Sequence, residues 1–406
     1  MFAASISSSE SHLLIWLTGV SFVLFQFFLQ LSSGIVIGSI MHTMELSAFG
    51  AGLLGSSLYV FYTSLQIPVG ILFDRKNTRY LMALNAAICG VGCLVFASSQ
   101  SLLGLFFGRF LIGIGSAFAF VGFSHILRQH FPLKQFAFMI GLSETLAFIV
   151  TVIAMIGMGS LLNEWGWRAF INSAGIAGLF IAALCWKNIP DSPSPLTNHP
   201  DYGQQLWRIL RNGKAWINGL FVGLNFTIVT VFGALWAVPF LQVKLNCSLP
   251  QASLLGAMFF LGAAVSCPFF GHISNFFSKR KPLIICSCIS TNLLLLLVIY
   301  WPIERLFNAG FLMFAIGCCC GAYMLAFSIA NELAPKDSLS TCTGFTNTLA
   351  MITAPLLQSF IGFLLDRVNT QDAYTLQDYQ FALLAIPAAL LIATILSFFL
   401  PEKKAH

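Results

Sequence analysis

The sequence predicts an all-α membrane protein with twelve transmembrane helices in two parallel six-helix halves. Three observations support this fold class. The 406 residues are 58% hydrophobic and only 8% charged, whereas about 25% of the residues in a soluble domain are charged. Twelve apolar runs are long enough for the roughly 20 residues that cross a bilayer. Two short motifs also recur about 200 residues apart, which indicates two related halves.

The apolar runs follow one another with short polar stretches between them. The first run exceeds the roughly 7–15-residue apolar core of a cleavable signal peptide, so we expect it to remain as the first helix. A stretch rich in Pro, Asn and Asp predicts an N-terminal bundle (1–187), a cytoplasmic linker (188–213) and a C-terminal bundle (214–406). The twelve runs lie near residues 13–41, 48–73, 80–99, 102–127, 135–162, 167–187, 215–242, 251–277, 282–301, 306–330, 340–365 and 378–400.

Lys and Arg are distributed unevenly between the two sets of loops. With the N-terminus inside, the inner loops and the C-terminal tail hold fifteen basic residues, and the outer loops hold four. By the positive-inside rule, this bias predicts that both termini are cytoplasmic. The compact chain and its short loops favour a bacterial inner membrane. Because the basic residues lie in short loops, they indicate topology rather than a nucleic-acid partner.

Of the eleven cysteines, only Cys247 falls in a predicted outer loop. The run Cys318–Cys320 could suggest a metal site. Consecutive residues of a helix point in different directions, however, and a buried Cys packs as a small hydrophobic residue. We therefore expect no disulfide framework, no metal site and no other cofactor.

Two repeated motifs define the relation between the halves. "GLSETLAFIV" at 141–150 is matched by "GFTNTLAMIT" at 344–353, and "GILFDRKNTRY" at 70–80 by "GHISNFFSKRK" at 271–281. The offsets are nearly equal and an even number of spans separates the copies, so the halves are expected to be parallel. This arrangement is characteristic of a large class of secondary transporters, whose site lies between the halves near the membrane midplane.

The first loop motif resembles the signature loop of the major facilitator superfamily. Asn77 stands where that signature has a second glycine, and we expect the turn to persist because Asn tolerates a left-handed backbone. The match is carried by Gly70, Asp74, Arg75 and Arg79. In the predicted fourth helix, Arg109, Gly113 and Gly115 resemble a second motif of the same superfamily.

The resemblance implies a monomeric transporter that moves a small-molecule substrate across the lipid bilayer by alternating access, without enzymatic activity. It also implies that helices 1, 4, 7 and 10 line the cavity. The predicted fifth helix has no Pro, unlike that of the drug–proton antiporters of this superfamily, which disfavours exchange-type drug efflux. The chain is similar to a bacterial subgroup that carries small organic anions, amino acids or peptides.

Charged residues within the membrane are costly, so each is a candidate functional residue. Arg109 lies about eight residues into the fourth helix, roughly 12 Å below the outer surface. It could contact a substrate carboxylate or take part in proton coupling. Alternatively, it could hold the helix to its neighbours by hydrogen bonds to backbone carbonyls.

Glu144 is the one carboxylate in the repeated decapeptide, and Asn347 replaces it in the second copy. A buried carboxylate without a partner favours its protonated form. We expect His125 to approach Glu144 across the hairpin of the fourth and fifth helices and to link proton binding to substrate occupancy. The alternative is that Glu144 only lines a water-filled inner vestibule.

Uncharged polar side chains complete the predicted substrate site. Gln26 and Gln30 share one face of the first helix because they are four residues apart. Hydrogen bonding between helices is the alternative role for each member of this group. The predicted contacts are Gln26, Gln30, Tyr62, Asn225, Tyr323 and Asn347.

The signature loop is assigned a different role because it lies at the inner surface, away from a midplane site. We expect Gly70, Asp74, Arg75 and Arg79 to form a conformational latch. In it, Asp74 engages a neighbouring helix N-terminus or an Arg while the protein faces outward.

These observations favour proton-coupled uptake of a small polar solute, such as an amino acid, a dipeptide or an organic anion. Uniport, a siderophore or drug transporter or exporter of the same fold, and a non-transporting membrane sensor are the alternatives. The sequence has no Gly-x-x-x-x-Gly-Lys-Ser/Thr loop, which argues against ATP-driven pumping. Its histidines are scattered, which argues against a membrane-embedded enzyme.

Overall fold

The computed structural model describes residues 8–31, 33–131, 133–191, 207–276, 280–333, 339–369 and 373–402. Every regular element in these ranges is helical. Twelve helical segments within them are long and apolar enough to cross a membrane, which confirms the predicted fold class.

The first six spans are built from six helices. The first span consists of α1 (Ser8–Leu31) and α2 (Ser33–Met44). The next three are α3 (Ala48–Arg75), α4 (Thr78–Ser98) and α5 (Leu102–His130). α6 (Leu133–Asn188) contains two spans joined at Gly166, whose φ of 75° allows the chain to turn where another residue would be strained.

Three of the second six spans are interrupted helices. The seventh contains α8 (Gly213–Asn225), the π-helix η1 (Ile228–Trp236) and α9 (Ala237–Leu245). The tenth contains α12 (Leu306–Cys320), the 3₁₀ segment η2 (Gly321–Met324) and α13 (Leu325–Leu333). The twelfth contains α15 (Leu376–Ala382) and α16 (Ala385–Ser397). The others are α10 (Leu249–Phe276), α11 (Lys281–Tyr300) and α14 (Leu339–Val368).

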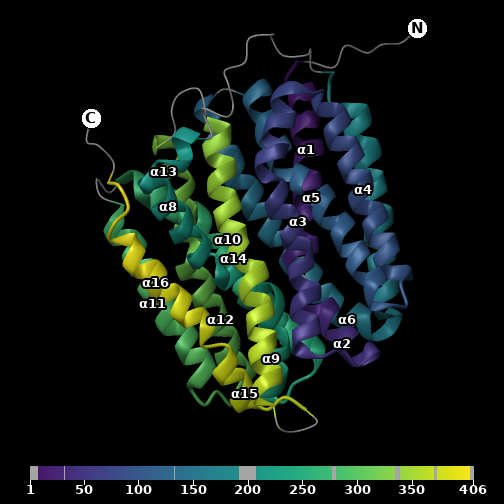
Figure 1. Cartoon of the computed structure of the whole chain (residues 1–406), viewed down its shortest axis with the longest axis vertical. Coiled ribbons are helices and arrows are strands. Elements are labelled where there is room, and N and C mark those ends of the chain that lie inside the picture. Colours follow the sequence, from purple (N-terminus) through teal and green to yellow (C-terminus); the bar gives the residue numbers. More distant parts are fainter. Residues whose placement is uncertain are drawn as a thin grey trace.

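The helices of the two sequence halves lie side by side. In Figure 1 the purple and blue helices occupy the right and the green and yellow helices the left. α14 packs along α3 and α10 packs along α6, so these two pairs join the halves. We call the end that holds the α3–α4 and α5–α6 loops the inner end, following the predicted orientation. The opposite end, where α2, α9 and α15 lie at the bottom of Figure 1, is the outer end.

Small residues allow these helices to approach closely. A Cβ atom at Gly262 of α10 would lie 2.2 Å from the Phe314 carbonyl oxygen of α12. A Cβ atom at Gly52 of α3 would lie 2.6 Å from the Gln358 carbonyl oxygen of α14. Close backbone approach of this kind is the usual basis of helix packing in membranes, because lipid provides no hydrophobic force between helices.

The predicted left-handed turn at Asn77 is wrong. Asn77 has a φ of −63°, and its side chain caps α4 by accepting a hydrogen bond from the Arg79 N–H. Asn replaces the glycine of the signature loop here because the position is a helix N-cap, where Asn is preferred.

Candidate functional site

A central cavity with an empty volume of about 370 Å³ lies between the halves. Among the described residues that line it, Glu144 is the only acidic one and none is Lys, Arg or His. The lining comes from α1, α3, α5 and α6 on one side and from α8, η2, α13, α14 and the junction after α8 on the other. It comprises Phe27, Tyr62, Phe120, Glu144, Val222, Phe226, Tyr323, Phe327, Asn347, Ala350 and Met351.

Glu144 is 7% exposed and lines this cavity from α6. One turn further along α6, the Phe148 ring packs against Phe27 of α1 at 6.3 Å and Phe260 of α10 at 6.1 Å. These contacts hold the Glu144 side of α6 toward the space between the halves. Within the described residues, Glu144 makes no hydrogen bond and no ion pair. A carboxylate in this position must take a proton or meet a cation from the cavity, because an isolated buried charge is costly.

A second cavity, with an empty volume of about 440 Å³, lies nearer the inner end. It contains His125 and Arg128 of α5 and shares Phe120 and Asn347 with the central cavity. The Asn347 amide donates to Gln66 Oε1 at 3.0 Å, which joins α14 to α3 where the two cavities meet. Asn347 therefore lies at the boundary between the central site and the inner end.

The predicted contact between His125 and Glu144 is not formed among the described residues. His125 Nε2 is 2.9 Å from Gln129 Nε2, and its ring lies 6.0 Å from that of Phe73. Glu144 comes 11 positions after the first residue of α6, whereas His125 is 5 positions before the last residue of α5. At a rise of about 1.5 Å per residue, Glu144 is about 9 Å deeper from the inner end. The predicted approach of His125 to Glu144 is therefore wrong, because the two residues lie at different depths from the inner end.

Arg109 is 5% exposed and does not line either cavity. Its guanidinium donates to the Leu54 carbonyl at 3.2 Å, the Gly55 carbonyl at 3.0 Å and Ser33 Oγ at 3.1 Å. These acceptors belong to α3 and α2, so Arg109 holds three helices of the first half together. The contacts favour the structural alternative for this residue.

Three of the predicted uncharged residues line the central cavity, namely Tyr62, Tyr323 and Asn347. The other three do not. The Gln26 amide donates to Gln30 within α1, and the Asn225 amide donates to Cys288 Sγ at 3.0 Å. The cavity thus unites Glu144 with these three residues, while His125 lies in the inner cavity.

The sequence prediction missed the aromatic lining of the central cavity. Phe27, Phe120, Phe226 and Phe327 line it together with the two tyrosines. The Phe226 and Tyr323 rings lie 4.5 Å apart. With 41 Phe in the chain, a single Phe carries little information. The one available signal was that these four Phe lie on helices 1, 4, 7 and 10, which the family resemblance assigned to the cavity.

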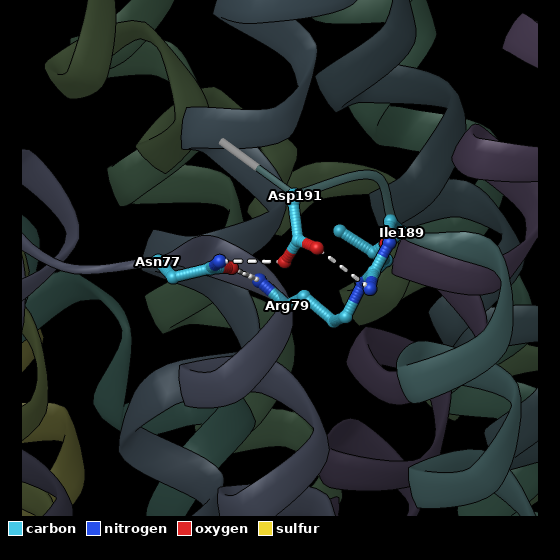
Figure 2. A network of polar contacts seen from close by, with 4 residues as sticks. All are labelled: Asn77, Arg79, Ile189 and Asp191. Atoms are coloured by element: carbon cyan, nitrogen blue, oxygen red, sulfur yellow. Dashed lines mark hydrogen bonds and ion pairs between the residues drawn. The ribbon is translucent and has the colours of Figure 1, made fainter. Parts of the chain in front are cut away.

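The described part of the predicted latch connects helices of the first half. Figure 2 shows that Arg79, at the start of α4, donates to the Ile189 carbonyl at 2.6 Å and pairs with Asp191 at 3.0 Å. The Asn77 amide donates to the same carboxylate at 2.7 Å. The side chains of Asp74 and Arg75 lie outside the described residues, so the predicted role of Asp74 stays a prediction.

The second copy of the loop motif makes a related connection. Arg280 is the repeat counterpart of Arg79, and its backbone N–H donates to Glu402, after α16, at 3.3 Å. Its guanidinium pairs with Glu332 at the end of α13 at 2.5 Å. In both halves, therefore, the Arg at this position connects the start of the third span with the segment after the sixth span.

Comparison with known proteins agrees with this architecture. A curated protein of Bacillus subtilis (strain 168), "Probable galactarate/D-glucarate transporter GudP", is 21% identical over 415 residues, which cover 89% of this chain and 85% of that protein. The "Probable hexose phosphate transport protein" of Chlamydia pneumoniae is 23% identical over 421 residues, covering 94% and 90%.

The fold is also found in a solved structure of a bacterial homologue of the human lysosomal transporter Spinster, in an inward-facing and unoccupied conformation. The TM-score is 0.76 at 17% identity, and the match covers 98% of this chain and 97% of that one. The family model described as Major Facilitator Superfamily matches residues 16–240 and 220–406. Because these matches span nearly the whole chain, the protein belongs to the major facilitator superfamily of membrane transporters.

Proposed function

We propose that the protein is a proton-coupled carrier of a small polar solute and that Glu144 is the group that takes up the proton. The observation that carries the proposal is the position of Glu144, a carboxylate that is 7% exposed, lines the central cavity and has no partner among the described residues. We expect the carrier to change conformation more readily when this carboxylate is neutral, because the charged form is poorly solvated.

The arrangement of the two cavities supports alternating access to this site. Contacts between α3 and α14 close the outer end, where Ser56 and Ser359 are 3.0 Å apart. The inner cavity leads from the Asn347–Gln66 hydrogen bond toward His125 and Arg128. A carrier in this state exchanges solute and protons with the inner side. We place that side in the cytoplasm and the protein in a bacterial inner membrane, in line with the bias of basic residues.

Transport into proteoliposomes tests the proposal. Radiolabelled amino acids, dipeptides and organic acids are offered with a pH gradient of either sign and without one. We expect wild-type protein to accumulate its solute with only one sign of the gradient. Glu144→Gln is expected to abolish this pH-driven accumulation, whereas solute counterflow at saturating concentration persists because it requires no net proton movement.

The control is Glu304→Gln, which makes the same chemical change at an exposed position of an outer loop and is expected to keep pH-driven accumulation. Unchanged pH-driven accumulation in Glu144→Gln would show that Glu144 is not the coupling group.

A further inference from the structure

We propose that the solute carries an ammonium group, which binds against Glu144 within the ring of aromatic side chains in the central cavity. The inference deepens the proposed function, because it takes the central cavity as the solute site. It concerns the chemical class of the solute and is independent of how the carrier is energised.

The first argument is the balance of charge in the cavity. Among the described residues, its lining includes one carboxylate and no cationic side chain. Arg109, the cationic residue that the sequence analysis considered for a substrate carboxylate, donates to three acceptors in α2 and α3. An anionic solute in this space would meet an unpartnered carboxylate and no counter-charge. An ammonium group would supply the partner that Glu144 lacks.

The second argument is the aromatic lining. Six aromatic side chains line the cavity: Phe27, Tyr62, Phe120, Phe226, Tyr323 and Phe327. Aromatic faces attract ammonium groups through the ring quadrupole, more strongly when water is excluded, and groups of aromatic rings are a recurrent means of binding amines. These rings can also cover the apolar part of the solute.

The third argument is the set of polar groups around Glu144. Titratable neighbours within electrostatic reach are Tyr62 of α3, Tyr323 of η2 and Cys267 of α10, all of which are neutral donors or acceptors. Asn347 adds a carbonyl and an amide at the boundary of the cavity. None of these groups neutralises a carboxylate, so the positive charge must come from a proton or from the solute.

The inference separates this protein from two relatives that match it in sequence over most of their length. The names of those relatives assign them galactarate or D-glucarate and hexose phosphate, all of which are anions. A proton and an ammonium group also compete for the same carboxylate.

Binding to purified full-length protein in lipid nanodiscs, at one pH and without a gradient, tests the inference. The probes are matched in size: valinol, 3-methylbutan-1-ol and 3-methylbutanoate, with galactarate and glucose 6-phosphate as anions. We expect valinol alone to raise the unfolding temperature. Glu144→Gln should weaken valinol binding more than about tenfold, as removal of one member of a buried charge pair does.

Glu144→Asp keeps the carboxylate and is expected to keep the preference for valinol. It serves as the second variant if Glu144→Gln does not fold. Glu304→Gln is expected to bind valinol as the wild type does. Three results would overturn the inference: no stabilisation by valinol, equal or tighter binding of the carboxylate or phosphate probes, or equal valinol binding by the wild type and Glu144→Gln. Loss of pH-driven accumulation, which tests the proposed function, is measured separately.

Discussion

The carboxylate of Asp366, near the end of α14, accepts a hydrogen bond from the backbone N–H of Phe49, in the first turn of α3, at 2.8 Å. Its other oxygen accepts from the Ala48 N–H at 3.0 Å and from the Tyr374 hydroxyl at 2.6 Å. Burial and the bond to Asp366 raise the pKa of Tyr374 to about 12, so its hydroxyl remains a donor at physiological pH. One carboxylate thus caps a helix of the opposite half and links the two halves at the outer end.

Removal of this charge should therefore favour the outward-open state. Asp366→Asn keeps one hydrogen-bond acceptor but loses the negative charge at the positive end of α3. The loss of this charge is expected to cost about 1 kcal/mol of the interaction. We expect the population with an open outer end to rise about fivefold. The measurement is the rate at which a membrane-impermeant maleimide labels a cysteine introduced at Ser359, with Cys247 changed to Ser.

Asp378→Asn provides the matched control. Asp378 also caps a helix at the outer end, in the capping box of α15, but its partner Thr375 is in the same half. Labelling in this variant is expected to match the background. Equal labelling rates in the Asp366 and Asp378 variants would show that the contact between Asp366 and α3 does not control the outer end.

The glycine contact between α10 and α12 should be sensitive to one added methyl group. A Cβ atom at Gly262 would lie 2.2 Å from a backbone carbonyl oxygen. Gly262→Ala is expected to reduce the free energy of unfolding by about 1–3 kcal/mol or more, because backbone cannot move aside as a side chain can. Thermal unfolding in detergent measures this change.

Gly157→Ala in α6 is the control, since nothing lies within 4 Å of a Cβ atom at that position. It is expected to be neutral or slightly stabilising, because Ala is a better helix former than Gly. A similar loss of stability in both variants would contradict the packing explanation.

Arg109→Lys should impair stability rather than solute recognition. Lys retains the charge but cannot serve the three acceptors that the guanidinium reaches in α2 and α3. We expect a loss of about 1–3 kcal/mol in unfolding free energy and little change in the KM of transport. Arg305→Lys, at an exposed outer position, is the control. Normal stability with a strongly raised KM would instead place Arg109 in the solute site.

The ion pair between Arg79 and Asp191 should contribute little to stability. The two side chains are 25% and 63% exposed, and exposed pairs are worth about 0–1 kcal/mol. Asp191→Asn is expected to shift the unfolding free energy by less than about 1 kcal/mol. A double-mutant cycle with Arg79→Gln measures the pair directly, and a coupling energy well above that range would reveal a buried network.

Local composition determined much of the fold. Apolar runs of bilayer length predicted the spans, because any backbone that crosses lipid must satisfy its own hydrogen bonds as a helix. The internal repeats predicted the relation of the two halves before any contact was known. The interruptions at η1 and η2 were not predicted. At η1, Gln358 of α14 donates to the Thr230 carbonyl at 2.7 Å, a contact 128 residues distant in sequence.

The sequence alone also singled out Glu144, because a carboxylate within an apolar repeat is conspicuous against its Asn347 counterpart. Only the tertiary structure decided its surroundings: the aromatic lining, the absence of a cation among the described lining residues, and the separation from His125. The same holds for Arg109, which the structure turns away from the cavity and toward backbone carbonyls. Hydropathy along the chain reports how each segment partitions into lipid, whereas the neighbours of a buried group depend on helix rotation, kinks and packing across the two halves.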